Sequence, residues 1–450
     1  MPPDGPTLAR LHRVNPSGTL FDSPSAGAAA IGPHTAMLDR AAAAHHAGDE
    51  IEARQALGAY LVLRAIDRAV ELGDDDGPDA RDGLRFQVAS VAKFVGELPK
   101  VGYVEANHLV GIANVLTDFA RDGERRLRIN LLAYSWYLEQ AGHLDEALDV
   151  VAVSEPLYRG AGAHELTNLG MTAGRFHRTL AHWDLADRGY ALGLESAAAT
   201  QDVRGMLLAR LGRAKVLLGR GNLPEARCQI EAIIAEAEGK DLADARAWGY
   251  ADLAVVLEKL GLTWDGLSAN YQAFRHFRDS QDRARVLSSL GAALRAVGAV
   301  GASRAALESV LRSTTNWYLI ANANVELMGI GADLKDEVMF RRHWRAAGEH
   351  VDLMAPSLAV DYRFQVAKGL SRFDRVNVAA KWFEDARETA ERHGLNEWYF
   401  RVVEAESQLS ASFADDCPIA VSQADVRYQS TVDEIEKGLR QYAEALVNQP

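Results

Sequence analysis

A helical-hairpin pattern that occurs twice in succession constrains this chain more than any other feature of its sequence. The first copy spans residues 206–239 and the second spans residues 248–277. Each copy has an apolar-periodic helix, a glycine turn at Gly221 or Gly261, and a second helix entered through Ala226 or Gly266. A repeated hairpin predicts a stack of similar units, which grows by addition and needs no single core.

The small residue on the second helix recurs along most of the chain, at separations of 39, 40, 40, 37, 37 and 39 residues. The series is Ala147, Ala186, Ala226, Gly266, Ser303, Phe340 and Ala379. A second series lies on the first helix of each hairpin and comprises Ser135, Gly174, Ala214, Ala254, Gly291, Met328 and Ala367. Met328 is the exception in size, and it faces Phe340 in the same degraded copy. An additional hairpin near the start has its turn at Gly48 and its small residue at Ala53. Unrelated helices would not show such regular spacing.

These two series resemble positions 8 and 20 of the tetratricopeptide repeat, where small residues let helix A and helix B approach closely. The resemblance covers residues 34–415 and implies an all-α fold, a right-handed α-solenoid of antiparallel helical hairpins. The units are longer than the usual length of about 34 residues, and most lack the closing proline. The longer unit is similar to that of the helical sensor domains of bacterial peptide-responsive regulators.

The two ends of the chain depart from the repeat. Residues 1–33 contain six prolines among glycines and serines, which predicts a flexible arm. Within residues 416–450 we expect a helix from about residue 425 to residue 446. Its apolar residues are spaced alternately four and three apart: Tyr428, Val432, Ile435, Leu439, Tyr442 and Leu446. We expect this helix to cap the last hairpin; the alternative is a homodimer through the C-terminal helix.

Composition excludes several classes of function. The formal net charge of −13 argues against nucleic acid and against an anionic membrane surface as partners. No run of apolar residues is long enough to span a membrane, and the start of the sequence does not read as a secretory signal. The two cysteines, Cys228 and Cys417, do not form a disulfide framework or a zinc site. We therefore expect a cytoplasmic, bacterial protein.

The sequence contains no recognisable catalytic machinery. It has no GxSxG, no Walker loop and no dinucleotide-binding motif, and its histidine pairs lack the spacing of metal ligands. We predict no catalytic residue, no metal and no cofactor.

The charges on helix A supply the main functional clue. Positions 2, 5, 9, 12 and 13 of helix A face the concave surface in this architecture. On these positions eight basic residues meet four acidic ones, which reverses the chain-wide ratio of 49 to 62. The basic residues are Arg175, Arg178, Lys215, Lys259, Arg285, Arg295, Lys368 and Arg372, and the acidic residues are Glu139, Glu258, Asp333 and Asp361. Trp248 adds an aromatic contact. The alternative is that these are ordinary solvated charges.

We therefore predict a non-catalytic scaffold that binds a protein, or an acidic or carboxylate-bearing peptide. Two other functions stay open. A ligand- or peptide-gated sensor would change shape on binding and so control another protein. An enzyme built inside the solenoid would need a buried acid or base, for which Glu258 and Asp361 are the candidates.

Overall fold

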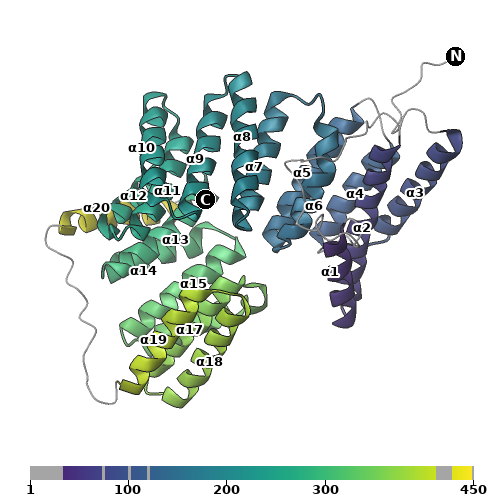
Figure 1. Ribbon diagram of the computed structural model, residues 1–450. Helices are drawn as coiled ribbons and strands as arrows, with labels where there is room; N and C mark the ends of the chain where they lie inside the picture. The colour runs from purple at the N-terminus through teal and green to yellow at the C-terminus, as the bar shows by residue number, and fades with distance from the viewer. Residues whose placement is uncertain (1–33, 73–76, 100–102, 119–121, 412–427, 448–450) are drawn as a thin grey trace. The chain divides into compact units, whose positions relative to one another are not determined.

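The structure is a computed structural model that describes residues 34–72, 77–99, 103–118, 122–411 and 428–447 (Figure 1). The predicted arm, residues 1–33, lies outside the described residues. The chain divides into two compact units, residues 1–222 and 223–450. The division falls in the turn of the 206–239 hairpin. None of the described helices combines the length and apolar character that crossing a membrane requires.

Regular structure in the described residues is entirely helical. The N-terminal unit contains α1 (Thr35–His46), α2 (Glu50–Glu71), α3 (Pro78–Gly96), α4 (Val104–Thr117), α5 (Gly123–Ala141), α6 (Leu144–Ser154), α7 (Ala163–Thr179), α8 (Trp183–Ala199) and α9 (Val203–Gly219). The C-terminal unit contains α10 (Leu223–Gly239), α11 (Ala243–Lys259), α12 (Thr263–His276), α13 (Ser280–Ala296), α14 (Val300–Ser313), α15 (Trp317–Asp333), α16 (Glu337–Gly348), α17 (Pro356–Arg372), α18 (Val376–Arg392), α19 (Asn396–Ala411) and α20 (Gln429–Val447).

Within each unit, consecutive helices pack side by side as hairpins, and each hairpin packs on the next. In the C-terminal unit, helices A are α11, α13, α15, α17 and α19, and α13 to α19 form one contiguous row. The expected all-α solenoid is confirmed.

A residue in the left-handed conformation ends helix A in every measurable copy of the repeat. The residue five positions before each small residue of helix B has φ between 55° and 88°. These turn residues are Gly48, Gly142, Ala181, Gly221, Gly261, Gly298, Lys335 and Asp374. Their spacing is identical to that of the small residues, so the backbone independently supports the register derived from the sequence.

The two series of small residues meet where helices A and B approach. Ser303 Oγ donates a hydrogen bond of 2.6 Å to the backbone oxygen of Gly291, its expected partner. A Cβ on Gly266 would lie 3.2 Å from the backbone oxygen of Ala254. Close approach of the two backbones therefore leaves room for small residues only.

Phe340 occupies a small-residue position and is nevertheless buried. A Cβ on Gly331 would lie 2.7 Å from the Phe340 backbone nitrogen, and one on Gly369 would overlap the Phe340 ring. Two glycines on neighbouring helices A thus provide the space that the phenylalanine fills. In this copy of the repeat a large residue on helix B is matched by glycines on helices A, so the helices remain closely packed.

We expected the C-terminal helix to lie on the last hairpin, but it does not. Instead, α20 packs against α12 and α14 of the same unit. Val432, Ile435 and Leu439 are buried there, and Tyr428 stacks on Trp264 with ring centroids 4.5 Å apart. The heptad spacing correctly indicated that one face of this helix is buried, but the helices that bury it are α12 and α14, which belong to two earlier hairpins. The apolar surface that we considered for a homodimer is therefore used within the chain.

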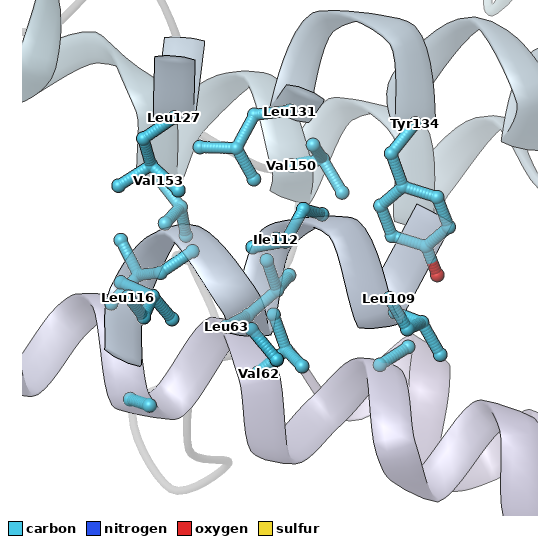
Figure 2. Packing of buried hydrophobic residues seen from close by; sticks show 14 of the residues in the cluster. Val62, Leu63, Leu109, Ile112, Leu116, Leu127, Leu131, Tyr134, Val150 and Val153 are labelled. Carbon is cyan, nitrogen blue, oxygen red and sulfur yellow. The ribbon is translucent and has the colours of Figure 1, made fainter. Parts of the chain in front are cut away.

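The N-terminal unit has an apolar core formed by α2, α4, α5 and α6. Leu109, Ile112 and Leu116 of α4 lie between α2 and the α5/α6 pair (Figure 2). Burial of these side chains is the main favourable term in the stability of the unit.

A buried arginine joins four helices beside that core. Arg40 of α1 donates to Glu105 of α4 at 2.7 and 3.0 Å, to Glu146 of α6 at 2.8 and 2.9 Å, and to Glu52 of α2. Each carboxylate lies in the first turn of its helix, where the helix dipole favours negative charge. Burial raises the pKa of Glu146 to about 7, although Arg40 acts in the opposite direction. We call these four residues the Arg40 cluster.

A second polar contact ties the start of α1 to α2 and α6. His34 Nε2 lies 2.9 Å from an oxygen of Asp67, and its Nδ1 lies 3.8 Å from Asp149. Burial alone would lower the pKa of His34, but the carboxylates of Asp149 and Asp67 outweigh it and raise the pKa to about 9. His34 is therefore protonated in the folded protein at neutral pH.

Lys335 should be replaceable by glycine with a gain in stability. Its φ of 55° is unfavourable for a residue with a Cβ but not for glycine. We expect Lys335→Gly to raise the free energy of unfolding by about 0.5–1 kcal/mol in urea titrations. Gly261→Ala, at the equivalent turn with open space around it, should lower it by a similar amount. A stability loss in Lys335→Gly would contradict the turn assignment.

His34 should make the stability of the N-terminal unit depend on pH. Because its folded-state pKa of about 9 exceeds the usual 6.5, its stabilising contribution is complete below pH 6.5 and is lost as the pH rises through 9. His34→Gln should cost roughly 2–3 kcal/mol at pH 6 and almost nothing above pH 9. Urea unfolding of both proteins across this range measures the difference. A difference that does not change with pH would exclude the protonated histidine.

Candidate functional site

The candidate site is the face formed by the predicted inner positions of helices A in the C-terminal unit. We call it the A-helix face; its charged residues include Arg285 and Arg295 of α13, Asp333 of α15, and Asp361, Lys368 and Arg372 of α17. Contacts between neighbouring helices confirm that these positions adjoin. Asn322 of α15 donates a 2.8 Å hydrogen bond to Ser288 of α13, and both occupy predicted face positions.

Arg295 links three helices A at the centre of this face. It donates to Asp333 at 2.8 and 3.0 Å, to Glu326 at 2.9 Å, and to the side-chain oxygen of Gln365 at 3.4 Å. A Cβ on Gly329 would overlap its guanidinium, so the glycine in α15 makes room for it. The Arg295 side chain is only 14% exposed. We predicted Arg295 as a ligand-binding residue, but its donors are already occupied by side chains of the chain itself.

Asp361 lies beside this network without an ion pair among the described residues. The side-chain amide of Gln365 donates a 3.1 Å hydrogen bond to one of its oxygens. Burial and the nearby charge of Glu326 raise the pKa of Asp361 to about 6, against the effects of Gln365, Arg401 and Arg295. Arg295 therefore faces three carboxylates, Glu326, Asp333 and Asp361, which is two more than its single charge balances.

Lys368 of α17 and Arg401 of α19 form a positively charged end of the face. Lys368 Nζ lies 5.6 Å from the centre of the Phe364 ring, and the Arg401 guanidinium carbon lies 5.5 Å from the same ring. Arg401 also lies 4.7 Å from the centre of the Trp398 ring. Burial lowers the pKa of Lys368. In the part of the chain that the structure describes, Lys368, Arg372 and Arg401 form no ion pair, although the charge of Asp333 acts on Lys368 and that of Asp361 on Arg401.

The other end of the face is aromatic. The Arg285 guanidinium lies 5.7 Å from the centre of the Trp248 ring and 3.5 Å from Asp282. Trp248 also makes an edge contact with Phe277 at 4.9 Å. Trp248 is therefore half-buried in packing and also borders the face. Lys259, the last residue of α11, is exposed.

The predicted residues of the N-terminal unit form their own group on α7 and α9. Arg175 pairs with Glu139 of α5 at 2.7 Å, and Arg178 donates to the Tyr190 hydroxyl of α8 at 3.3 Å. Lys215 is half-buried on α9. Both arginines are therefore engaged within the unit.

The structure narrows the predicted excess of positive charge. Arg175, Arg285 and Arg295 each have a carboxylate partner, whereas Lys368 and Arg372 of α17 and Arg401 of α19 form no ion pair among the described residues. Sequence reasoning missed Glu326 and Gln365, which lie outside the five face positions we counted, and Arg401, which lies on α19 beyond the last counted copy of the repeat. Gly329 was the available signal, because a glycine in the interior of a helix often marks a close approach.

Arg295 should be essential to the stability of the C-terminal unit. Its removal leaves Glu326 and Asp333 without a counter-charge beside Asp361, so Arg295→Ala should cost about 3 kcal/mol in urea unfolding. Arg341→Ala breaks only an exposed pair with Glu337, four residues earlier in α16, and should cost at most about 0.5 kcal/mol. Adding Glu326→Gln to Arg295→Ala should recover part of the loss. Equal effects of the two arginine substitutions would contradict the buried network.

Comparison with known proteins adds little to this picture. A scan against models of protein families found no match, and neither did a search of curated proteins. Among solved structures, the chain is similar to the crystal structure of a Rap protein complexed with competence and sporulation factor. That alignment has a TM-score of 0.46 and 10% sequence identity, and covers 78% of this chain and 99% of the other. Similarity at this level does not bear on function, which must be inferred from the side chains described above.

Proposed function

We propose that this protein is a non-catalytic scaffold that binds a protein or peptide along its A-helix face, through acidic side chains or a free carboxylate of the partner. The observation that carries the proposal is the group of Lys368, Arg372 and Arg401, none of which forms an ion pair among the described residues. A carboxylate placed between them would supply the missing counter-charge.

The surroundings of Lys368 strengthen the interaction that it can offer. Its charge is partly desolvated, so an ion pair there is stronger than one on an exposed lysine. The Phe364 and Trp398 rings fix the positions of Lys368 and Arg401 before a ligand arrives. Less side-chain entropy is therefore lost on binding.

The row of helices suggests the size of the ligand. Four helices A, from α13 to α19, lie next to one another, and neighbouring packed helices are about 10 Å apart. The face then extends over roughly 30 Å, the length of about nine residues in an extended peptide. We place Arg285 and Trp248 at its far end, with Lys259 beyond them, and assign Arg175, Arg178 and Lys215 to a matching surface of the N-terminal unit.

The carboxylates considered for an enzyme do not favour that alternative. Glu258 is exposed at the end of α11. Asp361 has a raised pKa, but one of its oxygens accepts a hydrogen bond from Gln365 beside the Arg295 network, which is a structural role. A binding scaffold accounts for the same charges without requiring a reaction.

Selection of peptides provides the test. A random peptide library would be selected on the full chain, and the affinities of the enriched peptides measured by fluorescence polarisation. We expect peptides rich in Asp and Glu, or dependent on a free C-terminus. The double variant Lys368→Gln/Arg401→Gln should bind them at least about tenfold more weakly, and salt should weaken binding to the wild type.

The matched control removes the same number of positive charges at two positions outside the A-helix face. Arg363 lies on α17 with its guanidinium on the backbone oxygen of Ala359, and Lys381 is exposed on α18. Arg363→Gln/Lys381→Gln should alter affinity by less than about twofold. Enrichment of peptides without acidic groups, or equal losses in the two double variants, would refute the proposal.

A further inference from the structure

A pocket that is separate from the A-helix face lies on the B helices of the C-terminal unit. Helices α14 and α16, both of type B, border a pocket of about 470 Å³. Ligand-binding pockets in proteins are typically about 300–1,000 Å³. None of its lining residues belongs to the A-helix face, so it is independent of the proposed function.

Part of the lining is apolar. Leu311 of α14 and Val338 and Met339 of α16 contribute to it. Met339 is buried, whereas Val338 is 81% exposed and has the largest exposed fraction of any large apolar side chain among the described residues. An aliphatic group in the pocket would cover Val338 and gain from the apolar area removed from water.

The charged part of the lining is dominated by arginine. Arg304 is paired with Glu308 at 2.8 Å, and Asp336 caps α16 by accepting a hydrogen bond of 2.9 Å from the Met339 backbone. Arg312 and Arg342 also line the pocket, and the described residues offer neither of them an ion pair. Neither of these two guanidinium groups has an ion-pair partner, and the three arginines of the lining exceed its two carboxylates, Glu308 and Asp336, by one charge.

His343 does not add to the positive charge. Its Nδ1 lies 2.8 Å from Oδ1 of Asn324, which assigns the proton of a neutral ring to Nδ1. Burial lowers the pKa of His343, and Arg342 and Arg304 lower it further, against the effect of Glu308. The pocket thus combines a neutral histidine, an aliphatic surface and two free arginines.

We propose that this pocket binds a carboxylate joined to an aliphatic group. Arginine matches a carboxylate with two parallel hydrogen bonds, and Leu311, Val338 and Met339 accommodate the aliphatic part. Either a free carboxylic acid or the C-terminal residue of a peptide carries this chemistry. The uncompensated charges select against the corresponding amide, which lacks the anionic group.

The test is calorimetric titration of the full chain with four probes. N-acetyl-leucine and its amide represent the free ligand, and a tetrapeptide ending in leucine, with a free or an amidated C-terminus, represents a chain end. We expect at least one of the two acids to bind, and its amide to bind at least about tenfold more weakly. Arg312→Gln and Arg342→Gln should each lower the affinity for the acid that binds by at least about fivefold.

Two controls separate this site from others. Arg341 is adjacent to Arg342 but pairs with Glu337 outside the pocket, so Arg341→Gln should leave the affinity unchanged. Lys368→Gln/Arg401→Gln removes charge from the A-helix face and should also have no effect. Failure of the proposed function at that face would thus leave this result intact, and the reverse also holds.

The outcomes decide both the site and the source of its ligand. Binding of N-acetyl-leucine supports a free acid, and binding of the tetrapeptide acid alone supports a chain terminus. Absence of binding by both acids up to about 10 mM would overturn the proposal. Equal binding of acid and amide, or full affinity in both Arg312→Gln and Arg342→Gln, would overturn it as well.

Discussion

The structure depends first on a backbone constraint, the left-handed residue that ends helix A in each measurable hairpin. That residue always lies five positions before the small residue of helix B. Helix B consequently returns with the same side toward helix A in each copy, and small residues can meet there. Where glycine is absent, as at Ala181, Lys335 and Asp374, the conformation persists despite its cost of roughly 1 kcal/mol. The packing of the hairpin therefore requires this geometry whichever residue supplies it.

A fixed hairpin geometry also aligns polar residues from one hairpin to the next, and in each unit it lets one arginine join several helices. Arg40 reaches a glutamate 106 positions away, and Arg295 reaches a glutamine 70 positions away. A solenoid has few such sequence-distant contacts, because each repeat mainly touches its neighbours. The planar guanidinium has five donors and can serve several helices together.

Both arginines are outnumbered by the carboxylates around them, and in each unit burial, together with the neighbouring carboxylates, raises the pKa of one carboxyl group. This group is Glu146 in the N-terminal unit and Asp361 in the C-terminal unit. Breaking either network would leave buried carboxylates unpaired, which is more costly than never having buried them. These clusters are best understood as structural, although Arg295 lies at the centre of the candidate binding face.

Much of the fold could be predicted from the sequence, because glycine and small residues mark places where the backbone itself is constrained. The spacing found Gly221 and Ala226, and it included Phe340, five positions after the left-handed residue that the structure shows at Lys335. The contact partners could not be predicted in the same way. The seam of α20 showed that one face is buried but not that Trp264 and Tyr271 cover it. Likewise, the repeat position of Arg295 gave its direction, whereas its partner Glu326 lies outside the positions that were considered.

The same distinction separates structural charge from functional charge on the A-helix face. A count of residues by position treats Arg295 and Lys368 alike, yet one is balanced by carboxylates and the other is not. Lys368 and Arg401 share the Phe364 ring, so two like charges are held near each other, and neither forms an ion pair among the described residues. Keeping them together has an electrostatic cost, which an incoming carboxylate would relieve. The negative charge of Asp361 already lowers this electrostatic cost in part. A ligand carboxylate at Lys368 and Arg401 therefore meets a positive potential that Asp361 has reduced. The affinity of the face for acidic partners is then set by the balance between these two cations and one carboxylate, more than by the total number of basic residues.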